Sequence, residues 1–173
     1  NADVAVHDEG RVALLTAWLR SPGQFETTFA MESFIDELAA AAKQDPLAFR
    51  LAHLQDPRAI GVLKAAAQAY GWESRPAGAR ADRSGNPAHG RGIAWVNRDD
   101  TRVATIADLT VDPSSGRIKV GRVVVAHDCG LVINPEGLKR TIECGMLHGL
   151  SRALWAEVRF DREKVIRVDW LSH

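Results

Sequence analysis

The chain has 173 residues, of which 46% are hydrophobic and 25% are charged, and these fractions are typical of a folded globular domain. Lysine plus arginine equals aspartate plus glutamate, at 22 each, so no overall positive field favours nucleic acid. No stretch approaches the roughly 18 apolar residues of a membrane span, and two cysteines exclude a disulfide-dense scaffold. We therefore expect a globular domain that binds no nucleic acid and has no transmembrane segment.

Residues 1–73 predict an extended N-terminal segment followed by a lobe of three short helices. Apolar residues at spacings of three and four predict the first helix from Phe29 to Lys43. The next two helices each follow an aspartate and a proline, the residues favoured at the N-cap and at the first helical position. These pairs are Asp45-Pro46 and Asp56-Pro57.

Residues 91–173 predict a sheet with one covering helix, after a loop over residues 74–90 that is rich in glycine, proline and arginine. The expected strands are Gly92–Asn97, Val103–Val111, Ile118–Ala126 and a final hairpin of Trp155–Phe160 with Val165–Trp170. Asp112-Pro113-Ser114-Ser115-Gly116 predicts a hairpin turn between the second and third strands. The continuous apolar run of the third strand favours a central strand covered on both faces. Sequential antiparallel strands predict the α+β class, a small helical lobe followed by a mostly antiparallel sheet.

The helix of this second part begins at Asn134-Pro135 and continues to about Leu154. It carries Gly145 and Gly149 on one face, where the missing side chains favour close approach by a ligand or, alternatively, tight packing on the sheet. Arg20, in a loop beside a tryptophan, has the chemistry to clamp a phosphate or carboxylate, with an ordinary surface salt bridge as the alternative.

Four side chains contain the atoms that zinc accepts, and these are His127, Cys129, Cys144 and His148. Their spacing matches no standard zinc motif, and cysteines that form no disulfide are commonly buried. We therefore predict no metal site and interpret the two cysteines as structural.

Several motifs, spread in order over most of the chain, resemble the large subunits of molybdenum hydroxylases, the family of xanthine dehydrogenase and aldehyde oxidase. The resemblance is greatest to the isoquinoline 1-oxidoreductase and membrane-associated aldehyde dehydrogenase type. The motifs are Arg20-Ser21-Pro22-Gly23, the helical segment from Phe29 to Arg50, Gly90-Arg91-Gly92, Val125-Ala126-His127-Asp128-Cys129-Gly130, Ile133-Asn134-Pro135 and Gly149-Leu150-Ser151-Arg152.

The resemblance implies a molybdopterin cofactor, in bacteria usually the cytosine dinucleotide form, and an iron–sulfur small subunit as the partner. It implies hydroxylation of aldehydes or N-heterocycles with oxygen from water. It also implies four cofactor-binding residues, Arg20, Asn134, Thr141 and Gly145. Thr141 stands where the family commonly has a glutamine, and Cys144 stands where it often has a glycine.

The family's catalytic glutamate belongs to a Gly-x-Gly-Glu motif, which this sequence does not contain. We therefore expect a fragment of the molybdopterin-binding region that has no catalytic residue, binds no cofactor alone and is inactive by itself. Such a fragment would expose apolar residues, among them Trp18, Trp155 and Trp170, through which it could oligomerise. The alternative is a stand-alone, non-catalytic α+β binding module. The compartment stays open between bacterial cytoplasm and periplasm.

Overall fold

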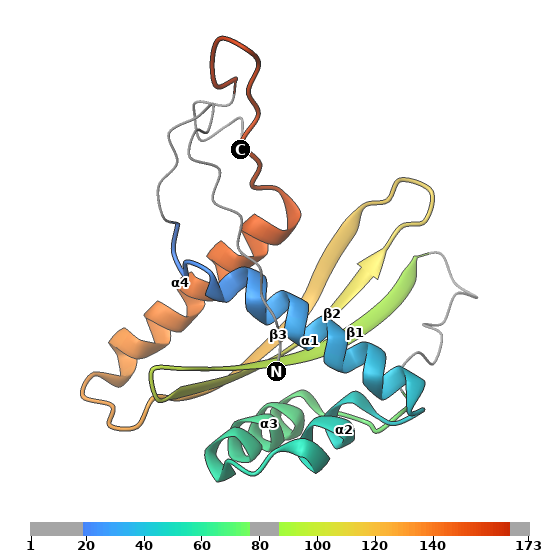
Figure 1. Ribbon diagram of the computed structural model, residues 1–173, viewed down its shortest axis with the longest axis vertical. Helices are drawn as coiled ribbons and strands as arrows, with labels where there is room; N and C mark the ends of the chain where they lie inside the picture. Colours follow the sequence, from blue (N-terminus) through green and yellow to red (C-terminus); the bar gives the residue numbers. More distant parts are fainter. Residues whose placement is uncertain (1–18, 77–86, 167–173) are drawn as a thin grey trace, which may run out of the picture.

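The computed structural model describes residues 19–76 and 87–166 (Figure 1). Within these ranges the elements are α1 (Gln24–Ala41), α2 (Pro46–His53), α3 (Pro57–Tyr70), β1 (Ala88–Arg98), β2 (Thr101–Val111), β3 (Ile118–Asp128) and α4 (Pro135–Leu154). The strands form one antiparallel sheet in the order β1-β2-β3. The α+β class is therefore confirmed.

Three helices begin at the predicted pairs of cap and proline. The Asp45 carboxylate accepts hydrogen bonds from the first backbone N–H groups of α2, the Asp56 carboxylate does the same for α3, and the Asn134 amide oxygen does so for α4. Helix α1 differs, because it starts at Gln24 rather than at Phe29 and has no side-chain cap. Its start is set by Gly23, whose φ of 71° is a left-handed conformation that glycine adopts without strain.

Both hairpin turns depend on residues in left-handed conformations. The two residues between β1 and β2, Asp99 and Asp100, have φ values of 47° and 63°, as in the tight type I′ turn. The predicted turn after β2 is confirmed: Gly116 has a φ of 70°, and its N–H donates to the Asp112 carbonyl at 2.8 Å. Hydrogen bonds from the hydroxyls of Ser114 and Ser115 lower the pKa of Asp112 to about 2.

The central strand of the described sheet is β2, so the expectation that the third strand is central was wrong. Strand β3 nevertheless has both faces covered, which explains its apolar run. Ala126 packs against the hydrophobic core, whereas Val123 and Val125 line a cavity on the opposite face. A strand that is covered on both faces has a continuous apolar sequence whether it lies at the edge or in the centre of a sheet.

Helix α3 packs on one face of the sheet and forms the core with it (Figure 1). The side chains of Leu63 and Ile106 are fully buried there, and Ala104 and Ile93 lie beside them. The predicted covering helix, α4, stands apart from α2 and α3 in Figure 1 and contributes no buried residue. The alternation of side chains along β2 and β3 places α4 over the face that α3 leaves open.

Helix α1 is attached to α2 and β1 by a buried ion pair that the sequence did not indicate. Arg50 is 2% exposed; its Nε donates to Glu32 at 3.0 Å and its Nη1 donates to Asp36 at 2.7 Å. Glu32 also accepts the backbone N–H of Trp95 in β1 at 2.8 Å. Burial raises the pKa of Glu32, and the Arg50 guanidinium opposes that rise.

Two predicted segments are tested only in part. The turn of the final hairpin is confirmed by an isolated bridge between Phe160 and Val165 and by an N–H of Asp161 that donates to the Lys164 carbonyl at 3.0 Å. The predicted first strand is wrong except at Phe160, because residues 155–159 form no strand. Residues 167–170 of the second strand and residues 1–18 lie outside the described residues. Strand β1 begins at Ala88, so it takes up the end of the expected 74–90 loop.

Candidate functional site

A cavity of about 580 Å³ separates α4 from the open face of the sheet. Its floor comes from β2 and β3, and its side toward α4 includes Gly145, Gly149 and Thr141. The loop before α1 closes one end with Arg20. The apolar floor residues are Val103, Ala107, Val123 and Val125. Few convergent polar groups in an otherwise apolar hollow are typical of a small-molecule site.

Arg20 lies directly against α4. Its Nη1 is 3.9 Å from the Cys144 sulfur, and its Nη2 would lie 3.4 Å from a Cβ built on Gly145. Gly145 therefore leaves the guanidinium room that a larger residue would reduce. No carboxylate within residues 19–76 and 87–166 forms an ion pair with Arg20. This cation is therefore free to bind an anionic or electron-rich group.

The C-terminal half of α4 is fastened to α1 through Arg152. The guanidinium of Arg152 lies 4.1 Å from the centre of the Phe25 ring and donates from Nη1 to the Arg20 carbonyl at 2.8 Å. Glu26 lies 3.9 Å from its Nη2. These contacts hold α4 close to the loop that carries Arg20, so the two walls of the cavity are linked at this end.

The structure brings together three of the four residues that the resemblance implied, since Arg20, Thr141 and Gly145 all line the cavity. The Thr141 hydroxyl donates to the Gly137 carbonyl at 2.9 Å, so its oxygen keeps only acceptor capacity toward a ligand. Asn134 does not line the cavity. Its Oδ1 accepts the Gly137 N–H at 2.9 Å, and its observed role is to begin α4.

The four residues considered for zinc do not assemble, because no group of metal-ligating side chains occurs among the described residues. His127 and His148 line the cavity, whereas Cys144 lies beside Arg20. Burial lowers the pKa of His127, and the neighbouring Asp128 carboxylate opposes the shift. Sequence reasoning considered His127 only as a metal ligand and missed its place in the cavity floor.

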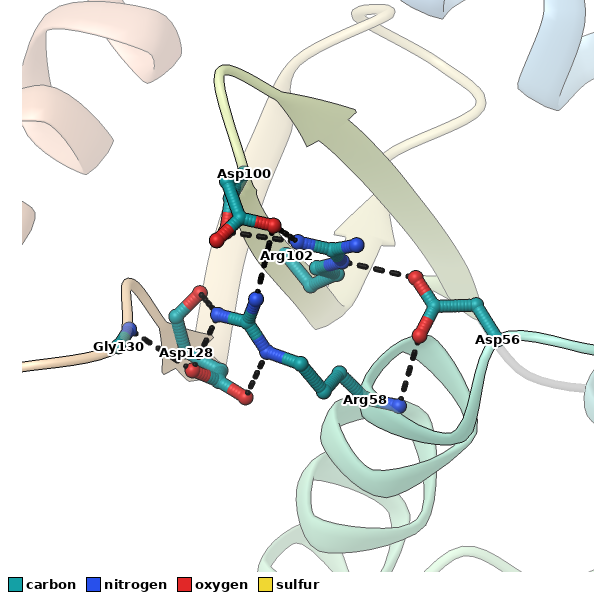
Figure 2. A network of polar contacts seen from close by, with 6 residues as sticks. All are labelled: Asp56, Arg58, Asp100, Arg102, Asp128 and Gly130. Atoms are coloured by element: carbon teal, nitrogen blue, oxygen red, sulfur yellow. Dashed lines mark hydrogen bonds and ion pairs between the residues drawn. The ribbon is translucent and has the colours of Figure 1, made fainter.

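A network of five charged side chains lies where the chain leaves β3 (Figure 2). Arg58, at the start of α3, donates from Nε and Nη2 to the two carboxylate oxygens of Asp128 at 2.9 and 2.7 Å. Its Nη1 donates to Asp100 at 2.9 Å, and Arg102 links Asp100 to Asp56. The network therefore joins the N-terminus of α3, the β1–β2 turn and the end of β3.

The network also determines how the connection to α4 begins. Asp128 accepts the N–H of Gly130 at 3.0 Å, so one carboxylate binds both Arg58 and the following loop (Figure 2). The Arg58 guanidinium holds the pKa of Asp128 well below its usual range. The Asp128 carboxylate therefore has a structural part in the turn that follows β3.

Among the described residues, Trp155 is 63% exposed, as expected for an apolar face. Trp18 and Trp170 lie outside them. No helix in the part of the chain that the structure describes is long and apolar enough to cross a membrane.

The fold and cavity define a domain that has one packed sheet face and one ligand-sized hollow under a helix. Residues 29–169 match the molybdopterin cofactor-binding domain family. The chain belongs to this family, which confirms the resemblance.

Curated relatives agree with the family match. One of the subunits of nicotinate dehydrogenase from Pseudomonas putida is 36% identical over 162 residues, which cover 89% of this chain and 14% of the relative. The beta subunit of isoquinoline 1-oxidoreductase from Brevundimonas diminuta is 34% identical, over 82% of this chain and 18% of the relative. The membrane-bound aldehyde dehydrogenase (pyrroloquinoline-quinone) of Gluconacetobacter polyoxogenes is 30% identical, over 80% of this chain and 19% of the relative.

This chain therefore spans less than a fifth of the length of these three relatives. No solved structure matches it.

The residues of the cavity fit part of a molybdopterin cofactor. Arg20 offers a cation with no carboxylate partner among the described residues, which suits a phosphate or another electron-rich group. Nothing lies within 4 Å of a Cβ built on Gly149, so the helix wall leaves open space there. The apolar floor suits the face of a flat ring.

Proposed function

We propose that this chain forms part of the cofactor pocket in the large subunit of a molybdopterin-dependent oxidoreductase. The reaction would be hydroxylation of an aldehyde or an N-heterocycle. The observation that carries the proposal is the cavity under α4, because Arg20, Thr141 and Gly145 line it together. They come from segments more than a hundred residues apart in the chain, so their meeting is a property of the fold.

Each residue has a distinct part in this proposal. Arg20 would bind an anionic or electron-rich part of the cofactor through its guanidinium. Thr141 would accept a hydrogen bond through its hydroxyl oxygen. Gly145, which has no side chain, would leave space on α4 for the Arg20 guanidinium. Asn134 would act indirectly by fixing the start of α4. When bound, the molybdenum of the cofactor would supply the oxidation chemistry, and these residues would orient the group.

The finer parts of the proposal follow from the resemblance. We propose the cytosine dinucleotide form of the cofactor and an iron–sulfur small subunit that carries the electrons away. Two of the relatives are named as single subunits of their enzymes, which supports assembly with a partner. We also propose that residues 1–173 by themselves are inactive, because the general base that the family places in Gly-x-Gly-Glu is absent from them.

The test starts from the natural polypeptide that carries this chain, purified from its source cells with any bound partners. Its size is measured by immunoblot and intact mass, its molybdenum by elemental analysis and its pterin by fluorescence after oxidation. Turnover is then measured with nicotinate, isoquinoline and an aldehyde in the presence of an artificial electron acceptor. We expect a polypeptide several times longer than 173 residues, stoichiometric molybdenum and pterin, and activity with one substrate class.

Two results would contradict the proposal. A natural polypeptide of only 173 residues without molybdenum or pterin would favour the stand-alone binding module. Steady-state oxidation of a substrate by residues 1–173 alone would contradict the expected inactivity.

A matched pair of variants tests the cavity itself. Arg20→Gln should lower the pterin content, because it removes the charge next to Gly145, whereas Arg117→Gln, at the exposed β2–β3 turn, should not. Equal pterin content in both variants would exclude Arg20 from the cofactor site.

A further inference from the structure

Several polar side chains line the cavity without a part in the proposed function, among them Thr105 and His148, and His127 differs from them in having a buried ring nitrogen without a partner. His127 lies near the end of β3, on the same face as Val123 and Val125, and it lines the cavity floor with them. Its Nδ1 is shielded from solvent and has no hydrogen-bond partner among the residues that the structure describes. Buried polar atoms without a partner are rare in folded proteins, so a histidine costs stability at this position and its presence requires a reason other than packing.

A valine would suit this position better if the position served only the fold. His127 pairs with Val103 across the sheet, and its neighbours on the same face are Val125 and Thr105. A strand favours β-branched side chains, and valine has no polar atom to leave unsatisfied. The imidazole of His127 therefore lowers the stability of the domain, and it does so at a position that lines the cavity.

The charges around His127 leave its ring neutral near pH 7. Burial lowers its pKa, and the one opposing carboxylate, Asp128, is bound by Arg58 on the other face of the strand. From the loop before α1 and from α4 the cavity presents Arg20, His148 and Arg152, and none of these carries negative charge to stabilise an imidazolium. A neutral imidazole has one donor and one acceptor nitrogen.

The partner of one ring nitrogen usually decides which nitrogen carries the proton. No described residue forms a hydrogen bond with Nδ1 of His127, so no residue fixes the tautomer. The ring can therefore adopt either tautomer and offer a donor or an acceptor, whichever the ligand requires.

We propose that His127 contacts the ligand of this cavity through a hydrogen bond at Nε2 of its neutral imidazole, since Nδ1 is shielded, and that the group it meets is a nitrogen heterocycle. This inference rests on the proposed function, because a pterin ring and an N-heterocyclic substrate share that chemistry. The apolar floor around His127 suits the face of such a ring, and the imidazole meets its polar edge.

The test uses His127→Val, His127→Gln and the matched control His89→Val, which changes an exposed histidine of β1. The variants are made in the natural polypeptide that carries this chain and are purified free of cofactor. Each is titrated with pterin and, separately, with isoquinoline, and the Kd is measured by fluorescence. The Tm of each variant is measured in parallel.

We expect His127→Val to weaken the binding of one probe about tenfold, the effect of losing one good hydrogen bond. His127→Gln should restore most of the affinity, and His89→Val should leave both affinities unchanged. The Tm of His127→Val should not fall, because the variant removes an unsatisfied polar atom. Weakened pterin binding would assign His127 to the cofactor, and weakened isoquinoline binding would assign it to the substrate.

The inference is overturned if His127→Val binds both probes as the wild type does, or if the wild type binds neither. The proposed function fails through a different observation, namely a natural protein without molybdenum, pterin or turnover. Either result can occur without the other.

Discussion

The two faces of the sheet differ in what covers them. Toward α3 the sheet is closed, and Leu63, Ala104 and Ile106 have no exposed surface. Toward α4 the same strands border a cavity of about 580 Å³, and α4 has no buried residue. Burial of apolar surface on one face therefore stabilises the domain, which leaves the other face free to accommodate a ligand.

The largest expected effect is on the α3 face. Leu63→Ala should lower the free energy of unfolding by about 2–5 kcal/mol, because it leaves a cavity in a packed core. The control on α4 is Leu147→Ala, which changes a side chain that is 62% exposed and should alter stability by less than about 0.5 kcal/mol. Urea unfolding measures the free energy of unfolding of both variants. Equal losses would show that α4 contributes as much as α3 and would refute the contrast between the two faces.

The next effect depends on pH and concerns the network that precedes α4. The Arg58 guanidinium lowers the pKa of Asp128, so the pair contributes stability above the ordinary aspartate pKa of about 4 and loses it as the pH falls below that value. Arg58→Met should therefore lower the Tm at pH 7 and lower it by less at pH 2. Arg98→Met, which removes an exposed pair with Asp99, is the control. A Tm difference that is the same at both pH values would exclude the ion pair as its cause.

A smaller effect is expected at the start of α4. Asn134→Ala removes the acceptor for the Gly137 N–H and should destabilise the helix by about 1 kcal/mol. Because α4 has no buried residue, the loss should be confined to it. Hydrogen exchange should therefore become faster at the α4 amides and stay unchanged in α3, and Asn134→Ser should restore protection. Faster exchange in α3 as well would mean that both faces unfold as one unit.

The smallest effect separates stability from ligand binding. Nothing lies within 4 Å of a Cβ built on Gly149 in α4 or on Gly61 in α3. Alanine at either position should raise stability by up to about 1 kcal/mol, through helix propensity. Only Gly149→Ala should lower the pterin content of the natural protein, because only Gly149 lines the cavity. A full pterin content in that variant would show that this part of the wall does not meet the cofactor.

Features set by neighbouring residues were predictable from the sequence. The caps Asp45, Asp56 and Asn134 and the turn at Asp112 use residues a few positions apart, and each is where it was expected. The start of α1 was missed because no side-chain cap marks it.

Features that join distant segments were not predictable. The Arg58–Asp128 pair connects residues 70 positions apart, and the buried Arg50–Glu32 pair connects two helices. The cavity depends on the distance between α4 and the sheet, which no local pattern encodes. The resemblance supplied Arg20, Thr141 and Gly145 as candidates, but only the fold places His127 beside them.

The contact between Glu32 and the N–H of Trp95 has a consequence for self-association. Strand β1 pairs only with β2 within the described sheet, so its outer edge presents backbone groups that another chain could extend. The Glu32 carboxylate occupies one of these donors, and α1 lies along the strand at that point. A new strand could dock there only by displacing α1 and uncovering the buried guanidinium of Arg50. The Arg50–Glu32 ion pair, which holds α1 in place, therefore also prevents another chain from pairing with the outer edge of β1.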